Sequence, residues 1–256
     1  MEDHDSDTFL QDYDKRLSEI FNFPSRLPPF DVNKDLLQNK VFQNWKGCSH
    51  SALLVLQGET VAPYLTGFSW ISPAAISVIR RLDNQLLDTN QGDTTALAYF
   101  CCPVVEAYED QSAHKISANA VLSALIYQLL KTKNAQPVLR DESRYSKLKH
   151  DIESMNPTIG STLADQRLRL RSILVDLLTT LAFPEVCIVL DRVDRISGNL
   201  DHLIEPLLDL VEGDKCVLKL LIVAPSIDHS IFSDKLSQKR FMRLVFDQGS
   251  LNIQST

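Results

Sequence analysis

Short runs of nearly continuous apolar residues recur along the chain. They occupy residues 51–57, 95–101, 186–190, 217–223 and 242–246. Apolar runs of this length are typical of strands that are covered on both faces, as in a parallel sheet. The pattern therefore predicts about five buried strands.

The segments between these runs have apolar residues at helical spacing. Leu37, Val41 and Trp45, for example, lie four residues apart. Ser72–Pro73 is a helix start signal, because serine caps a helix and proline suits the first helical position. Helices are predicted from Ser72 onward and over residues 8–21, 34–45, 117–130, 164–181 and 200–211. Leu168 is assigned to the apolar face of the helix over 164–181.

Strands that alternate with helices of ten or more residues predict right-handed crossovers and a parallel sheet between two helical layers. We therefore expect an α/β fold: a three-layer domain with a mainly parallel, about five-stranded sheet. The prolines Pro24, Pro28 and Pro29 indicate a linker, so residues 1–32 are interpreted as an N-terminal helix and linker and residues 33–256 as the domain. Residues 132–142 are expected to be poorly ordered.

The first helix has an apolar face made by Phe9, Tyr13, Leu17 and Phe21. An isolated helix of about fourteen residues is marginal in water, so this face must be covered. It docks either onto a partner or onto the domain, and the sequence leaves both open.

Charge and composition exclude several classes of protein. The net charge of −7 gives no basic footprint for nucleic acid, and no apolar stretch approaches the ~20 residues of a membrane span. The acidic N-terminus is unlike a targeting signal, and five cysteines without a pairing pattern suggest reduced thiols, so a cytoplasmic location is expected. The glycines are at least nine residues apart, which excludes intact G-x-x-x-x-G-K-[ST], G-x-G-x-x-G and G-x-S-x-G motifs.

The sharpest local candidate is the run that ends at Asp191, with Asp194 three residues further on. Ligands bind beyond the carboxyl ends of parallel strands, and carboxylates there can hold Mg²⁺ against nucleotide phosphates. Asp191 and Asp194 are therefore candidate metal ligands. The alternative is structural: both acids cap turns or pair with Arg192 or Arg195.

Taken together, these segments resemble the fungal NACHT-like P-loop domains of the signal-transducing (STAND) NTPases, the group with a nephrocystin-like N-terminal region. The resemblance covers about residues 33–246. It rests on Phe42–Trp45, Leu53–Gly58, Ala98–Cys101, Leu122–Leu130 and Cys187–Asp194. It implies a phosphate loop that starts at Gly58, with Gly58, Glu59, Thr60 and Thr66 as candidate nucleotide-binding residues.

The sequence departs from this family at three positions that the family uses to bind or hydrolyse phosphate. Pro63, Tyr64 and Leu65 stand where the loop has Gly, Lys and Ser/Thr, and no lysine occurs between Lys46 and Lys115. Arg195 replaces the acid that orients water, and Ala224–Pro225 precedes Ser226 where the family has Thr/Ser followed by arginine.

The sequence thus predicts a degenerate NTPase domain with no catalytic residue, which acts as a regulatory or protein-interaction module. No cofactor is expected, a protein partner or self-association is expected, and nucleic acid and membrane are not. The alternative is a working switch that binds ATP or GTP with Mg²⁺ through an atypical loop; a cysteine or serine hydrolase is the weakest reading. Compared with the family, the chain is expected to end before any lid or winged-helix segment.

Overall fold

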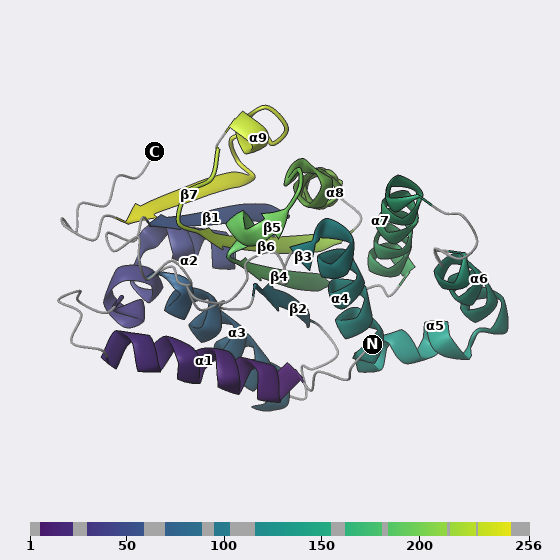
Figure 1. Cartoon of the computed structure of the whole chain (residues 1–256), viewed down its shortest axis with the longest axis horizontal. Helices are drawn as coiled ribbons and strands as arrows, with labels where there is room; N and C mark the ends of the chain where they lie inside the picture. The colour runs from purple at the N-terminus through teal and green to yellow at the C-terminus, as the bar shows by residue number, and fades with distance from the viewer. Residues whose placement is uncertain are drawn as a thin grey trace.

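A five-stranded parallel sheet forms the centre of the computed structural model, which describes residues 6–22, 30–58, 70–88, 95–102, 116–154, 162–180, 184–213, 216–228 and 230–246. The strands lie side by side in the order β2 (Thr95–Cys101), β4 (Glu185–Asp191), β6 (Val217–Ala224), β1 (Ala52–Gly58) and β7 (Phe241–Phe246) (Figure 1). All five predicted strands, and their parallel arrangement, are confirmed.

The strand register aligns the carboxyl ends of the strands. Asp191 pairs with Cys101 of β2 on one side and with Val223 of β6 on the other, and Gly58 pairs with Phe246 of β7. Since β6 alone separates β1 from β4, the ends of these two strands share one edge of the sheet. This is the placement that a phosphate loop after β1 and an acid after β4 require.

Helices cover both faces of the sheet. One face carries α1 (Ser6–Asn22), α2 (Lys40–Gly47) and α3 (Ser72–Asp88), and the other carries α4 (Ala118–Lys131), α7 (Leu163–Thr180) and α8 (Asp201–Glu212) (Figure 1). Alternate residues of each strand therefore enter two separate cores, as Leu54 and Val55 of β1 do. The predicted three-layer architecture is confirmed.

Shorter elements complete the described part of the chain. Ile116–Ser117 (β3) and Ile196–Ser197 (β5) form a two-stranded parallel ladder. The remaining elements are η1 (Val32–Leu37), η3 (Lys133–Ala135), α5 (Gln136–Arg140), α6 (Glu142–Glu153), η5 (Val193–Arg195) and α9 (Ser230–Ser233).

The structure corrects three details of the predicted elements. The helix expected over 34–45 is two helices, η1 and α2, because the side chain of Asn39 accepts a hydrogen bond from the Val41 amide at 2.8 Å and starts α2 afresh. Residues 133–140 are helical and not irregular. Leu168, assigned to the apolar face of α7, is 64% exposed.

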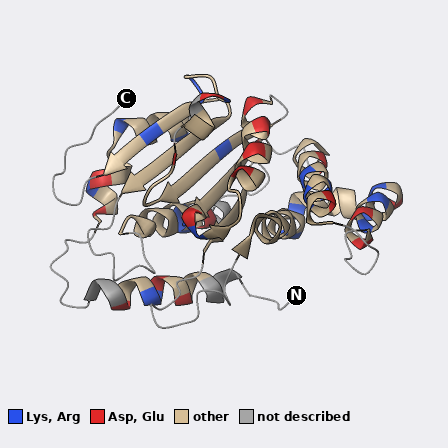
Figure 2. Cartoon of the chain, turned by 45° about the horizontal axis from the view of Figure 1, so that its top comes forward, with Lys and Arg blue, Asp and Glu red and all other residues tan. Residues whose placement is uncertain are grey.

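Helix α6 was not predicted, because all of its residues face solvent to some degree and it has no buried apolar stripe. Asp141 caps its start by accepting from the Arg144 amide at 3.1 Å. Charged residues gather on this and the other helices, while the strands are mostly uncharged (Figure 2). Within the part of the chain that is described, no helix has the length and apolar character to span a bilayer.

Helix α1 packs against the domain through one face. Leu10, Tyr13 and Leu17 are buried in the same core as α3, and Asp14 pairs with Arg80 of α3 at 2.8 Å. The side chains of Phe9 and Phe21 lie outside the description. Of the two ways to cover this face, docking onto the domain is the one present in the structure.

Truncation of Leu17 tests this packing. Leu17→Ala should lower the free energy of unfolding by about 2–4 kcal/mol, because a 2% exposed leucine leaves a cavity when it is truncated. The control Leu168→Ala, on an exposed leucine, should change it by less than about 0.5 kcal/mol. Urea denaturation measures both, and equal small effects would show that α1 is not part of the core.

Candidate functional site

The carboxylate of Asp191 is the centre of the site. It ends β4, has no solvent exposure, and is bonded by two hydroxyl groups from elsewhere in the sequence. The Tyr13 hydroxyl donates to Oδ2 at 2.6 Å, and the Ser72 hydroxyl donates to Oδ1 at 3.1 Å. Both carboxylate oxygens are thus bonded within the chain.

Three elements bring these groups together. Tyr13 is on the domain-facing side of α1, Ser72 is the first residue of α3, and Asp191 is the last residue of β4. The backbone fixes the strand end: the Cys102 amide donates to the Asp191 carbonyl at 3.0 Å, and the Arg192 amide donates to the Val223 carbonyl at 2.8 Å. The carboxylate position is therefore set by the sheet, and the hydroxyls are set by the two helices.

Burial determines the protonation of this cluster. It raises the pKa of Asp191 to about 7, while the hydrogen bonds from Tyr13 and Ser72 oppose the rise. Burial, together with the charge of Asp191, also raises the pKa of Tyr13 and of Cys101 well above their ordinary values. Tyr13 and Cys101 are therefore neutral near pH 7, and Tyr13 acts as a hydrogen-bond donor.

The second acid, Asp194, is held in an ion pair. Arg192 has φ 60° and ψ 43°, in the left-handed region that non-glycine residues seldom adopt. The Arg192 side chain is buried, and its guanidinium donates to both carboxylate oxygens of Asp194, the closest at 2.9 Å. The pairing with Arg192 considered for Asp194 is thus present.

Trp70 and Ile71, the two residues before α3, pack tightly against the end of β1. A side chain at Gly58 would place its Cβ 2.9 Å from Ile71 Cγ2 and 3.2 Å from Trp70 Nε1, so glycine is required there by close packing. Ile71 is completely buried and Trp70 nearly so. The residue directly before Ser72 is therefore an apolar core side chain.

The predicted site residues divide into two groups. Gly58, Asp191 and Asp194 lie at the carboxyl edge of the sheet, whereas Glu59, Thr60 and Thr66 lie outside the described residues, so their role stays a prediction. Sequence reasoning missed two partners of Asp191. Ser72 was visible as a helix start and Tyr13 as part of an apolar face, but neither pattern indicates contact with Asp191.

The arrangement defines a class of fold. In P-loop NTPases, a loop after the first strand leads into a helix whose first Ser/Thr hydroxyl, together with an aspartate at a neighbouring strand end, holds Mg²⁺. β1, α3, Ser72 and Asp191 reproduce this arrangement. The protein is a P-loop NTPase-like α/β domain.

Comparison with known proteins gives the family. Residues 32–224, about three quarters of the chain, match the family nephrocystin 3, N-terminal. The chain belongs to this family. No curated protein matches it.

A solved structure of the Aeropyrum pernix ORC1 protein in complex with DNA is similar to this chain, with a TM-score of 0.45 and 17% sequence identity. The likeness covers 87% of this chain and 47% of that one, so this chain spans about half the length of that protein.

The described residues do not fit a magnesium nucleotide while α1 is docked. Tyr13 occupies one oxygen of Asp191, and that carboxylate has no exposed surface. With Ser72 as the Ser/Thr that ends the P-loop motif, the position of the lysine falls on the buried Ile71, and not on Tyr64 as counting from Gly58 implied. Within the described ranges, no group of three or more His, Cys, Asp or Glu residues is arranged to hold a metal ion.

Removal of the Tyr13 hydroxyl tests the central hydrogen bond. At pH 8, Tyr13→Phe should lower the free energy of unfolding by about 1.5–3 kcal/mol, because a buried carboxylate loses a donor. At pH 5.5 Asp191 is mostly neutral, and the loss should fall to about 0.5–1.5 kcal/mol. Tyr145→Phe, on an exposed tyrosine of α6, is the control and should be neutral at both pH values.

The pH dependence of stability reports the raised pKa of Asp191. A carboxyl with a folded-state pKa of about 7 and an ordinary value of 3.8 contributes its stability in full below pH 3.8 and loses it as pH rises through 7. Relative to Asp191→Asn, which cannot ionise, the wild type should lose about 2–3 kcal/mol between pH 5 and pH 8. Urea denaturation at both pH values measures this difference, and parallel profiles would contradict it.

Proposed function

We propose that this P-loop NTPase-like domain is a non-hydrolysing regulatory and protein-interaction module of the signal-transducing type. The observation that carries the proposal is the complete burial and hydrogen bonding of the Asp191 carboxylate. Its two oxygens are bonded by Tyr13 and Ser72, so the residue that holds Mg²⁺ in active relatives is engaged by the chain's own N-terminal helix.

Two further substitutions support the absence of hydrolysis. Arg195 stands where the family has an acid that orients the attacking water, and its amide donates to the Arg192 carbonyl in the turn after β4. A guanidinium is always protonated and is therefore unable to act as a base. Ala224 at the end of β6 is a buried apolar residue, where the family has a polar phosphate sensor.

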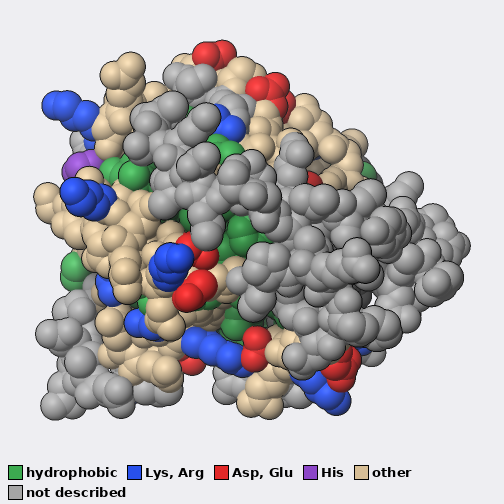
Figure 3. All heavy atoms as spheres, turned by 90° about the vertical axis from the view of Figure 1, so that its left-hand side faces the viewer, with side chains coloured by type: hydrophobic (Ala, Val, Ile, Leu, Met, Phe, Trp, Pro, Cys, Tyr) green, Lys and Arg blue, Asp and Glu red, His purple; other side chains and the backbone are tan. Residues whose placement is uncertain are grey.

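A protein partner is part of the proposal, and nucleic acid, membrane and a resident cofactor are not. On the side shown in Figure 3, acidic and basic side chains lie next to one another, which suits a protein surface better than a phosphate backbone. Large apolar side chains are exposed on α6 and α7: Tyr145, Ile152, Leu163 and Leu168. Because α6 and α7 contact each other, these side chains offer apolar area on neighbouring helices to a partner. We place the protein in the cytoplasm.

The Ser72–Asp191 pair favours a second candidate, a nucleotide-binding switch. A hydroxyl and a carboxylate 3.1 Å apart are the protein ligands that P-loop proteins offer to Mg²⁺. In this candidate, ATP or GTP binding displaces Tyr13 from the carboxylate. The two candidates differ in whether Mg²⁺ and a nucleotide bind together.

A nucleotide titration and a turnover assay on the full chain separate the candidates. The proposal predicts background hydrolysis of ATP and GTP, and no Mg²⁺-dependent binding of either by calorimetry, in the wild type and in Asp191→Asn alike. The asparagine keeps the side-chain shape, and an unchanged far-UV circular dichroism spectrum is the check that the variant folds.

Binding that requires Mg²⁺ and is lost in Asp191→Asn would establish the switch instead. Robust turnover lost in the same variant would overturn the non-hydrolysing proposal altogether.

A further inference from the structure

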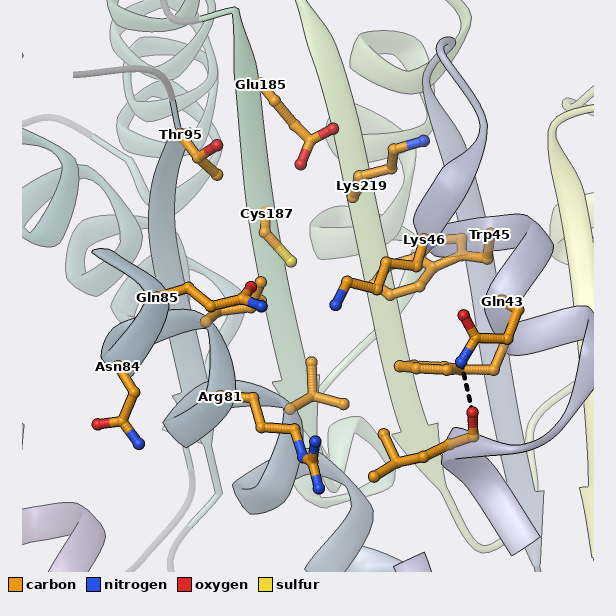
Figure 4. A pocket seen from close by; sticks show the side chains of 14 residues that line it. Gln43, Trp45, Lys46, Arg81, Asn84, Gln85, Thr95, Glu185, Cys187 and Lys219 are labelled. Atoms are coloured by element: carbon orange, nitrogen blue, oxygen red, sulfur yellow. Dashed lines mark hydrogen bonds between the residues drawn. The ribbon is translucent and has the colours of Figure 1, made fainter. Parts of the chain in front are cut away.

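A pocket opens at the amino end of the sheet, the edge opposite to Asp191. It has a volume of about 570 Å³ and lies between α2 and α3 above the first residues of three strands. Thr95 of β2, Glu185 of β4 and Lys219 of β6 mark this edge (Figure 4). The volume is in the range of small-molecule sites, which measure about 300–1,000 Å³.

The inner part of the pocket is apolar. Phe42 and Trp45 of α2 form one wall, with ring centroids 5.6 Å apart, and Val78 and Leu82 of α3 form the other. Cys187 lies on the floor, and burial raises the pKa of its thiol, so the floor is uncharged. These side chains offer a planar or aliphatic body a place away from water.

Two polar side chains converge over this apolar floor. Figure 4 shows the Lys46 ammonium and the Gln85 amide pointing toward each other, with the Cys187 thiol between them. Among the residues that the structure describes, no carboxylate lies within ion-pair distance of Lys46. Its charge is therefore available inside the pocket.

The charges around the pocket favour an anion. Lys219 is buried, and its ammonium is committed to the carbonyls of Cys48 and His50 and to the Cys48 sulfur. Arg81 at the rim donates to Asn33 Oδ1 at 3.2 Å. Glu185 is the sole acid among the lining residues, so the cations outnumber the acids.

We propose that this pocket binds a small organic monocarboxylate with an apolar body. Lys46 holds the carboxylate, and Trp45, Phe42 and Leu82 cover the body. A cation would meet the uncompensated charge of Lys46, and one exposed ammonium in a pocket that also contains the acid Glu185 suits a single negative charge better than a phosphate. The site is separate from Asp191 and independent of the proposed function.

Calorimetric titration of the full chain with 2-naphthoate tests the proposal, with the uncharged 2-naphthamide as the matched probe. We expect one site that binds the naphthoate about tenfold more tightly than the amide, in line with a charge-assisted hydrogen bond at a partly solvated position. Glu185→Gln removes the one acid and should tighten naphthoate binding about two- to threefold.

The lysine variants locate the site. Lys46→Met should weaken naphthoate binding about five- to tenfold and leave naphthamide binding unchanged. Lys40→Met is the control: Lys40 is an exposed lysine of the same helix that does not line the pocket. It should change the affinity less than twofold, and unchanged melting temperatures confirm that both variants fold.

Three results would overturn the proposal. The first is the absence of saturable 2-naphthoate binding up to about 5 mM; a dissociation constant near 1 mM corresponds to about −4 kcal/mol. The second is equal affinity for 2-naphthoate and 2-naphthamide. The third is an equal effect of Lys46→Met and Lys40→Met on naphthoate binding.

Discussion

A carboxylate removed from water has to find hydrogen-bond donors or take up a proton, and the Asp191 side chain imposes this requirement on the whole carboxyl edge of the sheet. Its donors come from α1 and α3, two helices on one face of the sheet. The hydrogen bonds from Tyr13 and Ser72 therefore tie both the docked α1 and the start of α3 to the end of β4.

In the nucleotide-binding candidate, a metal ion would have to bind a carboxylate whose Oδ2 already accepts a hydrogen bond from Tyr13 of the docked α1. A ligand shifts the equilibrium between the docked and undocked states of α1 only to the extent that it binds one state more tightly than the other. Ile71 is buried in the core, so this position supplies no positive charge that could hold the phosphates of a nucleotide. In the proposed function, the N-terminal helix is the regulated element, because a partner that binds α1 would control access to Asp191.

The sheet could be predicted because each strand is a contiguous apolar run, and contiguity is visible in a sequence. The helix start at Ser72 was visible because serine followed by proline is a local capping signal. The site was not: Tyr13 and Asp191 are 178 residues apart, and no local pattern records that one will bond the other. The break at Asn39 was missed because a side-chain cap leaves the hydrophobic periodicity unchanged. Helix α6 was missed because a fully solvated helix has no hydrophobic periodicity.

The measurement that bears most directly on this account is a double-mutant cycle between Tyr13→Phe and Asp191→Ala, read by urea denaturation at pH 7.5. A charge-assisted hydrogen bond of 2.6 Å between buried groups predicts a coupling free energy of about 1–3 kcal/mol. A coupling within about 0.3 kcal/mol of zero would mean that the two side chains act independently. In that case α1 does not close the site, and the regulatory role assigned to it is wrong.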